Sequence, residues 1–360
     1  MADPAAAATL APGERAAGAR HPAASVIIVA RDRRRDLEAA LAALAAQRLQ
    51  GASFEVLVVD DGSGDGTWEM LAARSESGAA AGEGASLRAL RHERSVGPGA
   101  ARNGAARAAS GDVLVFLDSD CVPHAGWLEA MLAPLRDPAV GAVGGAEVLD
   151  PSEPALARAF HFVLTSGLTT GGIRGRAGRR AGRYRPRTFS LALRRDAFER
   201  AGGFAGLRNG EDIDLSLRVA RLGLGLVYAP EARVFHRRRR TVGAFVRQCF
   251  AMGRARTTLI RRDRGHAEPV YFLPALALLG TIGLAIAATL SAAARPVAVA
   301  AAAGAGLYLA GVLLAGARAL ASPGPALLAP LAFVVQQAAY GAGFLHGIAR
   351  PFREEPRPAS

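Results

Sequence analysis

Three long uncharged runs in the last third of the sequence constrain its fold most strongly. The runs are residues 270–294, 296–317 and 319–349. Single arginines, Arg295 and Arg318, separate them. A helix needs about 20 apolar residues to cross a bilayer, and each run meets that length. We therefore expect a transmembrane domain of about three helices over residues 269–350, rather than a set of buried helices in a soluble protein.

Arginines near the first run indicate how this domain is oriented. Arg261, Arg262 and Arg264 precede the run, and basic residues concentrate on the cytoplasmic side of membrane helices. Residues 1–22 are rich in Ala, Gly, Pro and Arg and contain no apolar stretch of signal-peptide length. We expect them to be a disordered leader, we expect the soluble part that follows to lie in the cytoplasm, and we assign residues 351–360 to a tail.

A basic segment, residues 241–268, joins the soluble part to the first apolar run. Apolar residues such as Phe245, Cys249 and Ile260 recur in it at helical spacing, with arginines between them. Such a pattern is typical of an amphipathic helix that lies in a membrane interface. A buried helix of the soluble domain has the same pattern, so both interpretations stay open at this point.

The net charge of +13 does not by itself indicate a nucleic-acid-binding protein. Lysine is absent from the sequence, so all 44 basic residues are arginines, and alanine is abundant. This usage points to a general codon bias as much as to a basic patch, and the sequence has no zinc-finger spacing. We expect no nucleic-acid partner. Cys121 and Cys249 lie far apart, which fits a reducing compartment rather than a disulfide framework.

Residues 23–240 alternate between short β-branched runs and helical patterns. The clearest strand-like runs are residues 25–30, 54–59 and 113–117, and residues 87–90 and 140–148 are further candidates. Alternation of this kind predicts an α/β domain with a mostly parallel sheet flanked by helices. Such sheets bind ligands beyond the carboxyl ends of their strands. No GxGxxG follows the first run and no P-loop motif occurs, which argues against dinucleotide-binding and P-loop functions.

Acidic residues follow two of these runs directly. Asp118 and Asp120, with one residue between them, follow one strand-like run, and Asp60 and Asp61 follow another. Carboxylates at a strand end can hold a hard divalent cation, which takes oxygen ligands and often keeps substrate phosphates as the others. A surface acidic pair or a helix-capping turn has the same composition, so each pair alone is a weak signal.

A third acidic group, Glu211, Asp212 and Asp214, begins a helical pattern. Acids are favoured at the N-terminus of a helix, and Asp214 and Arg218 are spaced for an ordinary ion pair within a helix. These local interpretations account for each residue singly, but they do not account for three acidic clusters in this order.

The ordered set of motifs resembles the family 2 glycosyltransferases with the GT-A fold. The resemblance spans about residues 24–262 and rests on SVII, DDGSGDGT, GPGAARNG, FLDSD, GGF and GEDIDL, which begin at residues 25, 60, 97, 116, 202 and 210. It implies a GT-A nucleotide-diphospho-sugar transferase domain over residues 23–240, followed by the transmembrane helices. The nearest likeness is to membrane-anchored exopolysaccharide enzymes of the succinoglycan type, which also carry a basic segment like residues 248–254.

The resemblance implies which residues bind the donor, a nucleotide sugar. Asp61 would contact the base with Asp60 in support, and Arg102 lies where related enzymes approach the donor. Asp118 and Asp120 would bind the nucleotide diphosphate and the metal. A UDP-hexose is the commonest donor in the family.

The same resemblance implies the metal ligands and the catalytic pair. The metal, Mg or Mn, would be held by Asp120, Asp118 and the late histidine His236. Asp212 would be the general base that takes the proton of the acceptor hydroxyl, and Glu211 would position the acceptor. A single displacement of this kind inverts the anomeric centre.

The resemblance leaves several functions open. The leading prediction is an enzyme of the bacterial cytoplasmic membrane that builds a lipid-linked or cell-surface glycan. A processive polysaccharide synthase is an alternative, although the QxxRW motif is absent. A catalytically silent sugar-nucleotide-binding scaffold is the alternative from another class. Residues 31–32 depart from the Pro-Thr-Tyr-Asn that is common after the first strand in this family. Stacking of the nucleotide base at this place is therefore not predicted.

Overall fold

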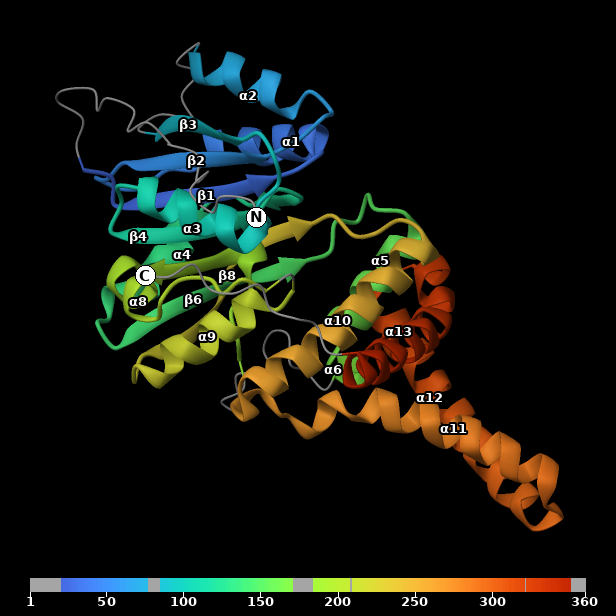
Figure 1. Cartoon of the computed structure of the whole chain (residues 1–360). Helices are drawn as coiled ribbons and strands as arrows, with labels where there is room; N and C mark the ends of the chain where they lie inside the picture. The colour runs from blue at the N-terminus through green and yellow to red at the C-terminus, as the bar shows by residue number, and fades with distance from the viewer. Residues whose placement is uncertain (1–20, 77–84, 171–183, 208, 321, 351–360) are drawn as a thin grey trace. The chain divides into compact units, whose positions relative to one another are not determined.

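The computed structural model describes residues 21–76, 85–170, 184–207, 209–320 and 322–350 (Figure 1). These residues form two compact units. The first unit contains residues 21–148 and Tyr184–His236, and the second contains residues 149–170 and 237–350. The expected leader, apart from its last two residues, and the expected tail lie outside the described residues.

An eight-stranded sheet organises the first unit, in the order β3-β2-β1-β4-β7-β6-β8-β5. The strands are β1 Ala24–Ala30, β2 Phe54–Asp61, β3 Ala85–His92, β4 Val113–Asp118, β5 Cys121–Pro123, β6 Val140–Val148, β7 Leu191–Arg194 and β8 Gly225–His236. The pairs from β3 to β4 are parallel, as is β6 with β8, whereas β7 and β5 pair antiparallel to their neighbours. The predicted parallel sheet is therefore confirmed on the N-terminal side, and it becomes mixed beyond β4.

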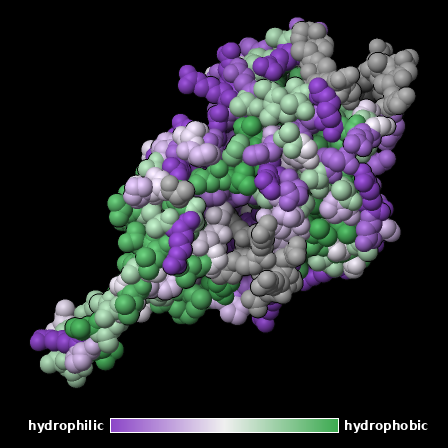
Figure 2. Space-filling model, turned by 180° about the vertical axis from the view of Figure 1, so that it is seen from behind, coloured by the Kyte–Doolittle hydropathy of each residue, from purple (hydrophilic) through white to green (hydrophobic). Residues whose placement is uncertain are grey.

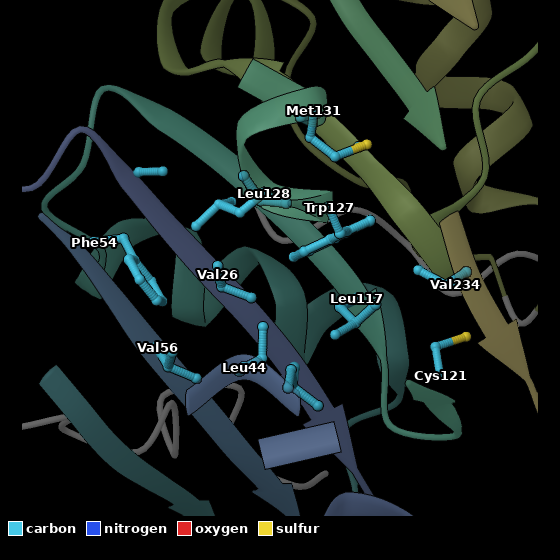
Figure 3. Packing of buried hydrophobic residues seen from close by; sticks show 14 of the residues in the cluster. Val26, Leu44, Phe54, Val56, Leu117, Cys121, Trp127, Leu128, Met131 and Val234 are labelled. Atoms are coloured by element: carbon cyan, nitrogen blue, oxygen red, sulfur yellow. The ribbon is translucent and has the colours of Figure 1, made fainter. Parts of the chain in front are cut away.

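Helices cover both faces of this sheet. They are α1 Arg34–Ala45, α2 Thr67–Glu76, α3 Pro98–Ala108, α4 Trp127–Leu132, α8 Arg195–Arg200 and α9 Glu211–Arg221, with 3-10 turns at Ala133–Arg136 and Thr188–Ser190. On one face Val26 and Val56 pack with Leu44 of α1 and Trp127 of α4, as Figure 3 shows. On the other face, Ile27, Leu57 and Phe116 pack with Ala101 and Ala105 of α3. Burial on both faces explains why the strands read as continuous apolar runs.

The strand register brings the acidic clusters to one edge of the sheet. Ala30 at the end of β1 pairs with Asp60 of β2, and Val29 pairs with Asp118 of β4. The two carboxylate-bearing strands thus flank β1 and end at adjacent levels, which is the arrangement that the sequence predicted. This edge carries the candidate site.

Helices alone form the second unit. They are α5 Ala155–Thr165, α6 Gly167–Thr170, α10 Val242–Arg262, α11 Leu273–Leu290, α12 Arg295–Leu320 and α13 Pro323–Ala349, with 3-10 turns at Arg264–His266, Pro269–Tyr271 and Ala292–Ala294. Among the described residues, three helices are long and apolar enough to cross a membrane, Leu273–Leu290, Ala292–Leu320 and Pro323–Ala349. Their exposed side chains include Leu276, Leu279, Ile286, Val299 and Leu307. Figure 2 shows apolar surface over the slender part of this unit.

The predicted amphipathic helix is present as α10, and α13 covers one side of it. Its apolar residues Phe245 and Cys249 are fully buried, and the Phe245 ring stacks on Phe160 of α5 at 3.8 Å between centroids. Val242 and Val246 remain exposed in its first turns. The sequence had placed α5 in the catalytic domain, whereas its residues group with the C-terminal helices. That α10 lies in a membrane interface stays a prediction.

Glycines allow α10 and α13 to approach closely. A Cβ at Gly343 of α13 would overlap the carbonyl oxygen of Phe250 in α10, and a Cβ at Gly253 would overlap the carbonyl oxygen of Tyr340. Small residues at such contacts let helix backbones pack tightly where the surrounding solvent is lipid.

We expect Gly343→Ala to lower the apparent Tm of the detergent-solubilised protein, because the added methyl group has no space. Overpacking of this kind costs about 1–3 kcal/mol. Gly280→Ala in α11 is the matched control, since a Cβ there has nothing within 4 Å, and it should leave Tm unchanged or raise it slightly. Equal Tm values for the two variants would contradict the tight α10–α13 contact.

Candidate active site

Asp60 is fully buried at the end of β2 and holds the loop that follows. Its Oδ1 accepts a hydrogen bond from the Ser63 backbone N–H at 3.3 Å, and the Arg91 guanidinium Nε lies 3.7 Å from its Oδ2. Arg91 in turn lies over the Trp68 ring, 5.1 Å from the centroid. The carboxylate thus orders the turn beside the sheet edge, and the supporting role predicted for Asp60 in binding the base stays a prediction.

Asp61 is the hub of the loop that leads into α3. Its carboxylate accepts hydrogen bonds from the Ser95 hydroxyl at 2.6 Å and from the backbone N–H groups of Val96 and Gly97 at 2.9 and 3.1 Å, and His92 Nδ1 lies 3.0 Å away. Burial alone would raise the pKa of Asp61, but these donors outweigh it and lower the pKa. The base contact predicted for Asp61 stays a prediction, since the contacts shown here are all within the chain.

Arg102 of α3 connects two acidic clusters that are distant in sequence. Its NH1 donates to Glu211 Oε1 and its NH2 donates to Asp118 Oδ1, both at 2.8 Å. The side chain is buried, and its guanidinium lies 5.6 Å from the centroid of the Phe204 ring. Burial disfavours the charged guanidinium, but the surrounding carboxylates outweigh this effect and raise the pKa of Arg102. The residue therefore remains a buried cation between Asp118 and Glu211.

Asn103, the next residue of α3, fastens the glycine-rich loop that carries Phe204. Its Nδ2 donates to the Phe204 carbonyl and its Oδ1 accepts from the Phe204 N–H, both at 2.9 Å. Gly203 has φ +64°, and a Cβ there would lie 2.8 Å from Asn103 Oδ1. The GGF motif is thus explained by a left-handed backbone and a close approach that a side chain would block.

The two acids that begin α9 have different environments. Glu211 is buried beside Arg102. Burial, opposed by Arg102 and aided by the charge of Asp212, raises the pKa of Glu211 to about 7. Asp212 is partly exposed, and its Oδ1 accepts the N–H of Ile213 at 2.8 Å. The predicted ion pair within this helix is confirmed, with Arg218 Nε 2.9 Å from Asp214 Oδ2. Of the two candidate catalytic acids, Asp212 is the one that solvent or substrate can reach.

Asp120, Cys121 and His236 form a group whose ligand atoms all lie within 4.8 Å of one another. His236 Nε2 lies 3.4 Å from Asp120 Oδ1. Burial lowers the pKa of the imidazole, but the carboxylates of Asp120 and Glu147 outweigh it and raise the pKa of His236 to about 9. A carboxylate oxygen and an imidazole nitrogen at this spacing fit Mn²⁺ well and Mg²⁺ through the oxygen.

Cys121 of this group and the neighbouring Asp118 have less to offer a metal ion than Asp120 and His236 have. Cys121 is fully buried and lies in the apolar core near Val234 (Figure 3), so we read its thiol as a packing group. Asp118 directs Oδ1 to Arg102. Burial raises the pKa of Asp118, and Arg102 offsets part of that shift. Asp118 thus lies between Arg102 and the candidate metal ligands. Asp120 and His236 are the pair of candidate ligands that lie closest together.

Two side chains beside His236 escaped the sequence analysis. Glu147 Oε1 lies 2.9 Å from His236 Nδ1, and the Phe189 ring stacks on the imidazole at 5.7 Å between centroids. Glu147 lies one residue before the end of β6, so it carried nearly the same signal as the acids at the ends of β2 and β4. Phe189 lies in a short 3-10 turn and had no such signal.

The sheet carries acids at the ends of β2 and β4, and Arg102 connects this edge to the acidic pair that begins α9. This arrangement defines a transferase domain of the GT-A fold. The family model for glycosyl transferase family 2 matches residues 25–208. The chain belongs to glycosyl transferase family 2. The recognition of that family from the sequence is confirmed; the likeness to succinoglycan-type enzymes is not tested.

Two relatives show how far the similarity extends. The glycosyltransferase AglE of Haloferax volcanii is 30% identical over 261 residues, which cover 72% of this chain and 81% of AglE. The pre-mycofactocin glycosyltransferase of Mycobacterium tuberculosis is 34% identical over 213 residues, which cover 58% of this chain and 43% of that protein. The chain thus spans less than half the length of the mycobacterial relative.

A solved structure supports the fold over nearly the whole chain. The mannosyltransferase PcManGT from Pyrobaculum calidifontis, solved in complex with GDP-Man and Mn²⁺, matches with a TM-score of 0.58 and 22% identity. The match covers 91% of this chain and 88% of that one. At this level of identity the match carries the fold, and the predicted GT-A domain followed by apolar helices is confirmed.

We expect Arg102→Met to destabilise the fold and to do so through its two carboxylates. Removing one partner of a buried ion pair costs about 3–5 kcal/mol, because an uncompensated charge stays buried. Adding Glu211→Gln should recover part of that loss in a double-mutant cycle of thermal unfolding. Arg107→Met, at an exposed position of α3, is the control. Additive losses in the cycle would contradict a coupled network.

The hydrogen bonds to the Asp61 carboxylate predict a specific loss of folding stability in acid. Because its folded-state pKa is lowered, the stabilisation is complete above its unfolded pKa of about 3.9 and is lost as the pH falls through the folded value. Asp61→Asn should therefore have a lower apparent Tm than the native protein at neutral pH, and the gap should narrow on acidification. Asp196→Asn, at an exposed site of α8, should show no gap. A gap that stays constant with pH would contradict this role.

Proposed function

We propose that the chain is an inverting, metal-dependent glycosyltransferase that moves a sugar from a nucleotide-diphosphate donor to an acceptor hydroxyl. One observation carries the proposal. Arg102 contacts both Asp118 of the DxD motif and Glu211, the neighbour of Asp212. One residue expected to bind the donor is thereby joined, through a buried charge network, to the neighbour of the residue expected to activate the acceptor.

Donor binding is assigned to the sheet edge. Asp120 and His236 would hold Mn²⁺ or Mg²⁺ together with Asp118, and the cation would neutralise the negative charge of the leaving diphosphate. PcManGT binds GDP-Man and Mn²⁺, which supports a nucleotide sugar and a divalent cation for this chain. Asp60 and Asp61 order the loops beside this edge, where the nucleoside would lie. UDP-hexose stays our first choice of donor.

Proton transfer is assigned to Asp212. Its partly exposed carboxylate can accept the proton of the acceptor hydroxyl, whereas Glu211 is buried and paired with Arg102. General-base catalysis by a positioned carboxylate contributes about 10²–10⁴-fold to rate. The acceptor oxygen would attack the anomeric carbon as the diphosphate leaves on the opposite side, so the configuration inverts. Glu211, through Arg102, would fix the start of α9 and thereby the place of Asp212.

The acceptor is proposed to be lipid-linked or part of a cell-surface glycan. Three helices suited to a bilayer support a membrane protein, and we place it in the bacterial cytoplasmic membrane with the catalytic domain in the cytoplasm. A processive synthase is the second enzyme candidate. A silent scaffold could use the acidic set at the sheet edge to bind a nucleotide sugar, but it would have no use for Asp212 as a general base.

A donor panel tests the proposal. We would measure hydrolysis and transfer of several nucleotide sugars by the detergent-solubilised full chain with Mn²⁺, Mg²⁺ or EDTA. One donor should turn over in a metal-dependent way. Asp120→Asn should lose donor turnover. Asp212→Asn should lower transfer by about 10²–10⁴-fold while keeping donor binding.

The control and the opposing outcomes are distinct. Asp196→Asn, on the surface of α8, should behave as the native protein. Multiple additions on one acceptor molecule without release would favour the processive synthase. Donor binding by the native protein without hydrolysis or transfer would favour the scaffold, and absence of donor binding with every metal would sink the transferase proposal.

A further inference from the structure

Glu147 and His236 lie on the same face of the sheet because of an irregularity in β8. Glu147 pairs with Val234 in the parallel β6–β8 ladder, and His236 lies two residues beyond Val234 on the same side. The register shifts just before this point, because Gly145 pairs with Ala229 and Ala146 pairs with Arg233. One step along β6 therefore corresponds to four along β8. Without the shift, the histidine would lie elsewhere along β6.

Both nitrogens of the His236 ring face carboxylates. Nδ1 lies 2.9 Å from Glu147 Oε1, and Nε2 lies 3.4 Å from Asp120 Oδ1. The side chains of Glu147 and His236 are 6% and 17% exposed, so water has little access to the pair. Phe189 stacks against the ring and limits its rotation. The ring is thus held by a carboxylate on one nitrogen and an aromatic face on its side.

A histidine that ligates a metal through one nitrogen commonly donates its other N–H to a carboxylate. Such a partner keeps the proton on the far nitrogen, orients the ring and increases the basicity of the ligating nitrogen. In this chain the far nitrogen is Nδ1 and the partner is Glu147. The ligating nitrogen would be Nε2, which already faces Asp120.

We propose that Glu147 is a positioning residue that holds His236 with Nε2 directed at the metal site. The inference rests on the proposed metal dependence of the enzyme. Glu147 itself does not touch the metal or the substrate. Glu147 raises the affinity for the metal because it keeps the His236 ring from rotating and keeps the proton on Nδ1 rather than on Nε2.

The readout is the binding of Mn²⁺ itself, measured by titration calorimetry on the detergent-solubilised full chain. Runs with Mn²⁺ alone are repeated in the presence of UDP and of GDP, which supply phosphate ligands. Glu147→Gln should weaken Mn²⁺ binding by about 10–100-fold, because the amide is a poorer partner for the Nδ1–H. Glu147→Asp, which keeps the charge on a shorter side chain, should weaken it less. Thermal unfolding establishes that each variant is folded.

A double mutant separates positioning from a general structural effect. His236→Ala should weaken Mn²⁺ binding, and adding Glu147→Gln to it should cause no further loss, since Glu147 acts only through the histidine. Glu153→Gln is the matched control, because Glu153 is another buried carboxylate paired with a cation, Arg240, at 3.1 Å. It should leave Mn²⁺ affinity unchanged.

The outcomes distinguish this inference from the proposed function. Unchanged Mn²⁺ affinity in Glu147→Gln, with affinity lost in His236→Ala, would overturn the role of Glu147 and leave the metal site intact. A loss in Glu147→Gln that persists in full in the His236→Ala background would also overturn it. Failure of the native chain to bind Mn²⁺ under all conditions would remove the metal dependence of the proposed function and this inference with it.

Discussion

The buried guanidinium of Arg102 is the interaction on which the catalytic unit depends. It contacts Asp118 and Glu211, which lie 16 and 109 residues away in the sequence. Burying a cation costs folding free energy unless the cation is paired and hydrogen-bonded at distances as short as these. The contact therefore fixes three elements against one another, the N-terminal half of α3, the end of β4 and the start of α9. Of the acids that we assign to chemistry, Asp118 takes part in this contact, and Asp120 and Asp212 lie beside it.

The loops at the same edge are ordered by the same kind of interaction. Asp61 gathers the Ser95, Val96 and Gly97 donors, so the chain enters α3 at a defined place and Arg102 follows from there. Asn103 then fastens the Phe204 loop with two reciprocal hydrogen bonds. Asp60, Asp61 and Asn103 thus hold backbone in place. Asp120 and Asp212 are the ones that we assign to the cation and the acceptor.

Local patterns in the sequence predicted much of this fold. The run at 140–148 is β6 residue for residue, and the Asp214–Arg218 pair forms as its spacing predicts. Elements as short as β5 and β7, with three and four residues, carry too little periodicity to be recognised. Nothing local showed that Arg102 would be buried or that Glu147 would reach His236, since both depend on register and long-range packing. The grouping of the α5 residues with the C-terminal helices was not apparent from the sequence either, because an apolar helix alone does not reveal what it packs against.

We propose a direct displacement in which Asp212 takes the acceptor proton. The decisive measurement is the anomeric configuration of the transferred sugar, determined by NMR on the isolated product. The new glycosidic bond should have the configuration opposite to that of the donor. Retention of the donor's configuration would contradict it, because retention excludes a single displacement and leaves Asp212 without the role of base.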